Sequence, residues 1–184
     1  GELEAFKPGN VSVYADGHDM TVHDFQKSAE LVTPILCDRN NSLGERIFKS
    51  VDATKNAVGC NTNLGMLLLF APLVIAAESV FANEKDLRFN LESTLSSVTQ
   101  VDADKVFAAI CLANPGGLGD VDQYDVHEQP DCSLLQAMLA ASERDSIALQ
   151  YTNNFYEVFS IGYATLKDFD KYWNSVKWST VSCY

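Results

Sequence analysis

A polar segment near the start of the chain carries groups that could do acid–base or metal chemistry. Asp16, His18 and Asp19 place two carboxylates and an imidazole within four residues of a loop rich in Gly and Asp. Magnesium prefers carboxylate oxygens, often shared with substrate phosphates, and a His or Asp side chain can serve as a general base. We therefore take all three as candidate catalytic residues, and Asp16 and Asp19 as candidate magnesium ligands. The alternative is that the loop only connects elements and that His18 is an ordinary loop histidine.

A second polar segment stands directly before the most apolar run of the sequence, residues 64–77. Asn61, Thr62 and Asn63 would lie at the start of a helix formed by that run. A helix N-terminus offers backbone N–H groups and the positive end of the helix dipole to an anion. The three residues are therefore candidate substrate-binding residues. The simpler alternative is that Asn61 or Thr62 only caps the helix.

Two further segments complete the set of candidates. Gly116 and Gly117 follow Pro115 in a turn that would let a ligand approach the backbone closely. This turn lacks the Lys-Ser/Thr pair of a P-loop and follows no strand, so taken alone it predicts only a turn. Arg144 and Asp145 are adjacent, and we expect Arg144 to contact phosphate and Asp145 to act as a base or third magnesium ligand. The alternative for this pair is a solvated helix face with weak local ion pairs.

Composition excludes several classes of partner. The formal net charge of −12 and the pI near 4.5 argue against nucleic-acid binding, because no basic patch would neutralise a phosphate backbone. The 64–77 run contains Pro72 and is shorter than the roughly 20 apolar residues of a membrane span, so no membrane association is expected. Five scattered cysteines without a CxxC pair predict reduced thiols in a cytoplasmic protein. An acidic protein of this kind would need a bound cation, Mg²⁺ by expectation, to hold a polyphosphate.

The elements that must position these groups are helices. We expect a compact all-α, multi-helix single domain over residues 1–184, with 64–77 as a central helix buried on all sides, because no segment alternates with a period of two. Helix starts are predicted at Thr21 with Asp24, at Ser42, at Asp102, and at Asp131 or Ser133. Helix ends are predicted at Gly59 and Asn114. We expect the helix that starts at Asp131 or Ser133 either to continue through Phe159 or to break once before it.

Five motifs, in this order, carry a resemblance to a known family: KPGNV, GHDM, CNTNLG, PGGLGD and ERDSIALQY. Together they resemble the triphosphoribosyl-dephospho-CoA synthase family over Glu4 to about Phe159. The resemblance implies an all-α transferase that moves the triphosphoribosyl group of ATP to the 2'-hydroxyl of 3'-dephospho-CoA and releases adenine. Family members are typically longer than 184 residues, which implies that this chain lacks the C-terminal part of the fold. On this resemblance Lys7, Asn10 and Gln150 join the candidate substrate-binding residues, with Lys7 as a phosphate contact.

The chain also departs from the better-known citrate-lyase type of the family. That type resembles KPGLVDR and NTHKG, so Val13, Asn63 and Leu64 stand here where basic residues or histidine would be, and Leu118 replaces an arginine. Fewer basic residues favour, as alternatives, a ribosyl or phosphoribosyl transferase with a different donor or acceptor, or a non-catalytic nucleotide-binding protein. The sequence does not decide whether the protein forms a homodimer. We expect nucleotides and dephospho-CoA-like small molecules as the partners of the site.

Overall fold

The computed structural model describes residues 3–7, 10–17, 20–116 and 124–184. Over these residues the chain is built of helices, with two isolated β-bridges and no strand, so the all-α prediction is confirmed. The helices are α1 (Val22–Leu36), α2 (Leu43–Val58), α3 (Leu64–Glu78), α4 (Glu84–Ser96), α5 (Gln100–Ala113), α6 (Leu134–Ala141), α7 (Ser146–Thr152), the π-helix η1 (Val158–Tyr163), α8 (Ala164–Trp173) and α9 (Val176–Cys183). Within the described part of the chain, no helix is both long and apolar enough to cross a membrane.

Contacts between residues divide the chain into two compact units. The larger unit is Lys27–Asn154, and the smaller one combines Gly1–Gln26 with Phe155–Tyr184. We describe each unit by itself. The expectation of one domain over residues 1–184 stays a prediction.

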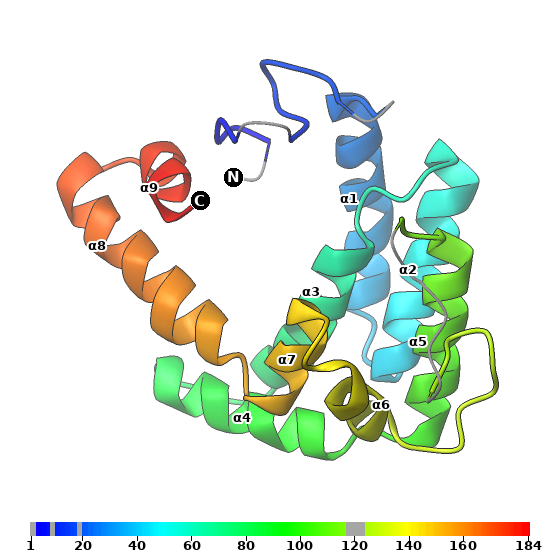
Figure 1. The fold of residues 1–184 in the computed structure, drawn as a ribbon. Coiled ribbons are helices and arrows are strands. Elements are labelled where there is room, and N and C mark those ends of the chain that lie inside the picture. The colour runs from blue at the N-terminus through cyan, green and yellow to red at the C-terminus, as the bar shows by residue number, and fades with distance from the viewer. Residues whose placement is uncertain (1–2, 8–9, 18–19, 117–123) are drawn as a thin grey trace. The chain divides into compact units, whose positions relative to one another are not determined.

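In the larger unit, α2 and α5 lie side by side along their lengths (Figure 1). They approach closely at Gly44, where an added Cβ would lie 2.7 Å from the Cα and carbonyl oxygen of Asp102. Only glycine fits so near a neighbouring backbone. At the far end of α2, Gly59 adopts a left-handed conformation with φ 79° and ends the helix as predicted. The pair forms one side of the core on which α3 packs.

The Asp102 carboxylate joins the beginnings of these two helices. Its Oδ2 accepts hydrogen bonds from the backbone N–H and the hydroxyl of Thr99, both at 2.9 Å. Its Oδ1 accepts from the Ser42 hydroxyl at 2.8 Å and from the Gly44 N–H at 2.9 Å. Ser42 caps α2 as predicted, whereas α5 begins after Thr99, with Asp102 as the partner in its capping box. One carboxylate therefore fixes the start of both helices.

Helix α3 is central, since it packs against α2, α4, α5 and α7. Pro72 lies inside it and has no N–H to donate to the carbonyl oxygen of Leu68, one turn earlier. The hydroxyl of buried Tyr151, in α7, donates to that oxygen at 2.7 Å instead. The prediction that α3 is buried on all sides is wrong at Phe70, whose side chain is 51% exposed. A run without polar residues gives no signal of which side lacks a packing partner.

A buried ion pair closes the opposite end of α3. Arg46 of α2 is only 2% exposed, and its Nη1 donates to Glu78 Oε1 and to the Leu36 carbonyl oxygen, both at 2.7 Å. Its Nε donates to the carbonyl oxygen of Asn41 at 3.1 Å. The guanidinium group thus joins the last turns of α1 and α3 to α2. A buried charge with this many partners is a structural group.

The segment after Ser133 breaks twice, where at most one break was expected. Ser133 caps α6 as predicted, and a tight turn over 142–145 leads into α7. The second break follows α7 at Asn154 and Phe155, which have φ values of 55° and 58°. Left-handed conformations are uncommon for residues other than glycine, so a sequence offers little warning of them.

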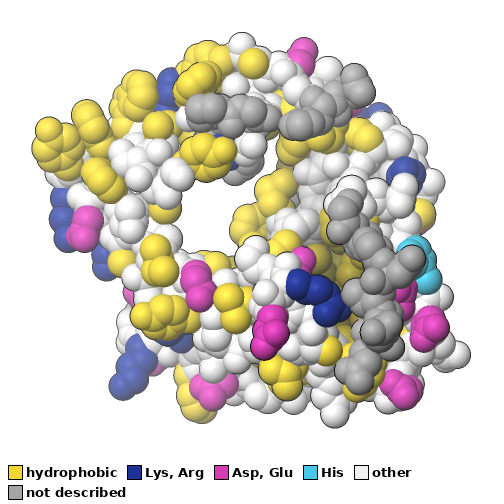
Figure 2. Space-filling model, in the orientation of Figure 1, with side chains coloured by type: hydrophobic (Ala, Val, Ile, Leu, Met, Phe, Trp, Pro, Cys, Tyr) yellow, Lys and Arg dark blue, Asp and Glu magenta, His cyan; other side chains and the backbone are white. Residues whose placement is uncertain are grey.

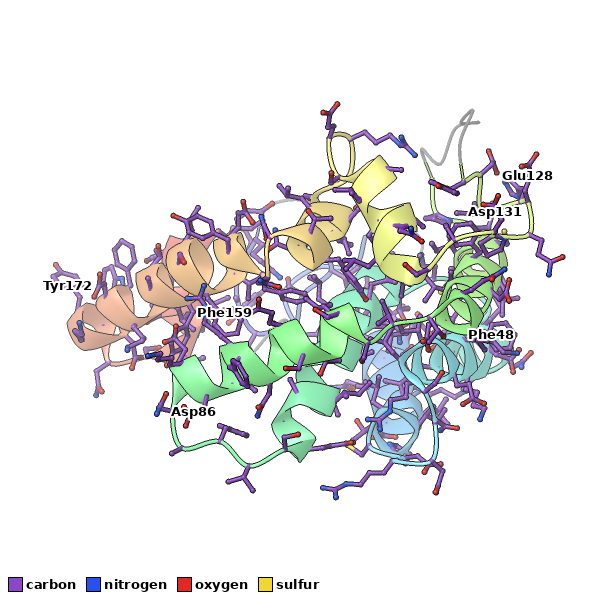
Figure 3. All side chains as sticks on the ribbon, turned by 90° about the horizontal axis from the view of Figure 1, so that it is seen from below. Phe48, Asp86, Glu128, Asp131, Phe159 and Tyr172 are labelled. Carbon is purple, nitrogen blue, oxygen red and sulfur yellow. The ribbon has the colours of Figure 1, made fainter. Side chains whose placement is uncertain are left out.

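In the smaller unit, α8 packs against η1 and α9. Lys177 of α9 donates to the Tyr14 hydroxyl, and its ammonium lies 4.7 Å from the centre of the Tyr14 ring. This contact ties α9 to the N-terminal segment. Phe159 is buried at η1, whereas Tyr172 projects outward from α8 (Figure 3).

Candidate functional site

A cavity of about 640 Å³ lies within the larger unit. Four helices form it, α3, α5, α6 and α7, together with the chain before α3, after α5 and at 124–126. The lining residues are Asn61, Leu64, Gly65, Leu68, Val106, Phe107, Ile110, Pro115, Gly116, Tyr124, Asp125, Val126, Ala137, Met138, Ala141, Arg144, Asp145 and Ile147. Its size is that of a small-molecule site.

The floor of this cavity is apolar. Phe107 of α5 and Ala137 of α6 belong to a buried cluster with Cys132, against which Tyr124 and Val126 pack. Leu68 of α3 adds a further buried aliphatic side chain. A floor of this kind takes the flat or aliphatic part of a ligand, and leaves recognition of charge to the rim.

The rim near α3 carries Asn61, whose side-chain oxygen bonds to the backbone at the start of that helix. Its Oδ1 accepts from the N–H of Leu64 at 3.0 Å and of Asn63 at 3.3 Å. Asn61 thus satisfies N–H groups at the start of α3 without being its cap residue, which is Asn63. Thr62 and Asn63 are buried and turn to other helices: the Thr62 hydroxyl lies 2.7 Å from that of Ser28, and Asn63 donates to Thr54 at 3.0 Å. Neither residue lines the cavity, and their predicted substrate contacts stay predictions.

Arg144 and Asp145, also in the cavity lining, form the turn between α6 and α7, whose first turn meets that of α3. Asp145 caps α7, with Oδ1 accepting from the N–H groups of Ile147 and Ala148, both at 2.8 Å. Its Oδ2 has no hydrogen-bond partner among the described residues. Arg144 Nη1 donates to the Ala140 carbonyl oxygen at 3.2 Å, and no described carboxylate lies within ion-pair distance of it. Both side chains are exposed and free to meet a ligand.

The wall at 124–126 was missed by the sequence analysis. Asp125 lines the cavity, while Glu128 and Asp131 of the same acid-rich stretch project outward (Figure 3). Behind this wall, the Cys111 thiol donates to the carbonyl oxygen of Val126 at 3.1 Å. Burial, with a smaller contribution from the charge of Asp125, raises the pKa of Cys111 and so favours the protonated thiol. Only the concentration of acidic residues before Pro130 hinted at this wall.

The chain was compared with known families, with curated proteins and with solved structures. The sequence model of the CitG family, ATP:dephospho-CoA triphosphoribosyl transferase, matches residues 1–184, the whole chain. This protein belongs to the CitG family. No curated protein and no solved structure matches it. The family assignment confirms the predicted function and enzyme class, transfer of the triphosphoribosyl group from ATP to dephospho-CoA.

The other predicted site residues of this CitG-family chain lie in several places. Gly116 lines the cavity, whereas Gln150 is buried within α7, donates to the Ser146 carbonyl oxygen at 3.3 Å and does not line it. Lys7, Asn10 and Asp16 belong to the smaller unit, where Lys7 is buried and the other two are exposed. His18, Asp19 and Gly117 lie outside the described residues. The structure therefore brings Asn61, Gly116, Arg144 and Asp145 to one cavity.

The described residues offer few groups for a metal ion. Among them, no cluster of three or more His, Cys, Asp or Glu side chains could hold one. Two carboxylates, those of Asp125 and Asp145, nevertheless line the cavity. Magnesium bound together with substrate phosphates usually takes only one or two protein carboxylates and keeps several waters. The residues of the cavity thus fit magnesium carried in by a nucleotide.

Proposed function

We propose that the cavity of the Lys27–Asn154 unit is the site of triphosphoribosyl transfer and that it binds ATP. The observation that supports this is the pairing of an apolar floor with a rim that holds both Arg144 and the start of α3. A nucleotide has the matching construction, a flat base joined to an anionic tail. The base would pack on Phe107 and Leu68, and the triphosphate would extend to the rim.

Arg144 is the basic side chain among the cavity-lining residues, and in the proposal it binds the triphosphate. A guanidinium group can donate two parallel hydrogen bonds to phosphate oxygens. The first turn of α3 adds backbone N–H groups that have no partner within the helix. Basic side chains are sparse on the face shown in Figure 2, and acidic ones lie among them. The positive charge of Arg144 therefore matters more for phosphate binding than the electrostatic potential of the surrounding surface.

Asp145 acts as the general base in the proposed reaction. The C1'–N9 bond between ribose and adenine breaks, and a bond forms between C1' and the 2'-oxygen of dephospho-CoA. The hydroxyl proton passes to Oδ2 of Asp145, and adenine leaves with the electron pair of the broken bond and takes up a proton. Because Oδ1 is held by two N–H groups of α7, Oδ2 has a fixed direction. Positioning of this kind contributes a large part of the rate of a group transfer.

Magnesium is part of the proposal, with Asp125 as the residue that would hold it, because Oδ2 of Asp145 takes up the hydroxyl proton. When bound it neutralises triphosphate charge, which a chain of net charge −12 otherwise repels. The predicted roles of Asp16 and Asp19 as ligands stay predictions. A cytoplasmic location also belongs to the proposal, supported by the five cysteines, all of which are free thiols.

The test is incubation of the protein with ATP, magnesium and 3'-dephospho-CoA, with adenine and the transfer product measured by mass spectrometry. We expect both products from the wild type. Arg144→Ala should raise the KM for ATP about 10- to 100-fold, because it removes a charged phosphate contact. Arg39→Ala is the matched control, since Arg39 is exposed and lies outside the cavity lining.

Calorimetric titration of ATP gives the second arm of this test. Binding should be weaker in EDTA than in magnesium, and the loss should be smaller for Asp125→Asn than for the wild type. Equal affinity in both buffers would contradict the magnesium proposal while leaving transfer itself open to the product assay. Absence of adenine release under all conditions would overturn the proposed function.

A further inference from the structure

Helix α7 is held against α3 at two points that are one helical turn apart. Gly65 in the first turn of α3 meets Ile147 in the first turn of α7, and Leu68 meets Tyr151. Gly65 and Leu68 are three residues apart, and Ile147 and Tyr151 are four apart, so each pair lies on one face of its helix. The second contact is C-terminal to the first in both helices. The two helices therefore run parallel here, with their N-termini at the same end.

The first point of contact depends on the absence of a side chain at residue 65. A Cβ added to Gly65 would lie 3.2 Å from Ile147 Cδ1. This is shorter than the 3.5–4.0 Å or so at which carbon atoms pack, so a larger residue at 65 presses on Ile147, which must shift by a few tenths of an ångström. Ile147 itself lines the cavity and directly follows Ser146, the first residue of α7.

The second point of contact depends on the proline in α3. Pro72 leaves the Leu68 carbonyl oxygen without its helical donor, and the Tyr151 hydroxyl takes that place at 2.7 Å. Tyr151 is 1% exposed, so no water competes for the oxygen. The hydrogen bond is directional, and it fixes how far α7 can slide along α3.

The consequence lies at the other end of α7. Arg144 and Asp145 directly precede this helix, and Asp145 is bonded to its first amides. The position of both side chains at the rim is therefore set by where α7 lies on α3. We propose that Gly65 and Tyr151 are positioning residues, which fix the register of α7 against α3 and thereby hold Arg144 and Asp145 in place for group transfer. The kinetic part of this inference rests on the proposed function.

The test uses Gly65→Ala, Tyr151→Phe and a rescue variant. Gly65→Ala introduces the clash with Ile147 Cδ1, and Ile147→Val removes that atom. Gly65→Ala should therefore have an effect in the wild type and little effect when it is added to Ile147→Val. Tyr151→Phe removes the hydroxyl group alone. Two controls match these changes: Gly162→Ala, where the new Cβ would have an ordinary 3.6 Å contact, and Tyr172→Phe, which removes an exposed hydroxyl.

Two measurements are made on each variant. Amide hydrogen exchange at Ile147 and Ala148, the residues bonded to Asp145, reports the position of α7 without any substrate. We expect exchange about tenfold faster at these amides in both single variants, with no change at Val106 in α5. We also expect kcat for adenine release to fall about tenfold, with a smaller rise in the KM for ATP than for Arg144→Ala, because Arg144 is displaced and not removed.

Each outcome decides between the proposals. Unchanged exchange in both single variants, or failure of Ile147→Val to rescue Gly65→Ala, would overturn the register. Faster exchange with unchanged kcat would overturn the positioning role. If the exchange results come out as expected while the wild type releases no adenine, the register stands and the proposed function fails.

Discussion

Two aspartates stand at helix starts in the larger unit, and their surroundings are opposite. Asp102, between α2 and α5, is 6% exposed and accepts four hydrogen bonds, two on each carboxylate oxygen. Asp145, between α6 and α7, is exposed and lines the cavity. Its Oδ1 accepts two hydrogen bonds, and its Oδ2 accepts none from the described residues. Both are aspartates at the start of a helix, but Asp102 is the third residue of α5, whereas Asp145 directly precedes α7 and is its cap.

Two arginines repeat this contrast. Arg46 is buried and its guanidinium group meets Glu78 and two carbonyl oxygens. Arg144 is exposed and donates to one carbonyl oxygen. A charged group whose partners are all within the protein stabilises the fold and has nothing left for a ligand. The half-satisfied group at the edge of a cavity is the one that can act on a substrate.

The largest effect is expected for Asp145→Asn, which tests whether Asp145 does more than cap α7. Asparagine caps a helix about as well as aspartate, so we expect nearly unchanged thermal stability. It cannot accept the hydroxyl proton, and turnover should fall roughly 10²- to 10⁴-fold. Adenine release and thermal unfolding are measured on the same preparation. Wild-type turnover, or unfolding of the variant, would show that Asp145 is only a cap.

Asp102→Asn should give the reverse result. In the wild type each carboxylate oxygen of Asp102 accepts from one N–H and one O–H group. In the variant an amide nitrogen replaces one of these oxygens, and the two donors that bonded to it have no acceptor. Unsatisfied buried donors cost about 1–3 kcal/mol each, so we expect a loss of about 3 kcal/mol in the free energy of unfolding. Urea denaturation measures it. A loss below about 1 kcal/mol would contradict the structural role, and the KM of the remaining folded protein for ATP should be unchanged.

Much of the fold follows from local signals that the sequence displays. Ser42, Thr21 with Asp24, and Gly59 all mark helix ends where they were predicted. Leu91 and Leu95 are buried on α4, as their spacing predicts. The second break after α7 was not predicted, because it rests on left-handed conformations at Asn154 and Phe155. Neither residue is a glycine, and packing rather than local preference decides such turns.

The candidate site was harder to predict for a geometric reason. Residue types pointed to Asn61, Arg144 and Asp145, which do line one cavity. They pointed equally to Thr62 and Asn63, whose side chains turn into the protein toward Ser28 and Thr54. Successive residues at a helix start point in different directions, and only the docking of α3 on its neighbours determines which direction is inward.

The smallest expected effect concerns pH and sharpens the account of Asp102. Burial alone would raise the pKa of this carboxyl, but the hydrogen bonds from Gly44, Thr99 and Ser42 outweigh it and hold the pKa below the usual 3.8. A group with a lowered pKa in the folded state stabilises the protein fully above its unfolded pKa, and the contribution disappears as the pH falls through the folded pKa. The advantage of wild type over Asp102→Asn in urea denaturation should therefore be constant from pH 7 to 5 and shrink below about pH 4. Taking the difference between the two proteins cancels the other carboxyls with lowered pKa, such as Glu45 and Asp38. An advantage that grows as the pH falls would mean that the carboxyl of Asp102 is protonated in the folded protein, and would remove the basis for contrasting it with Asp145.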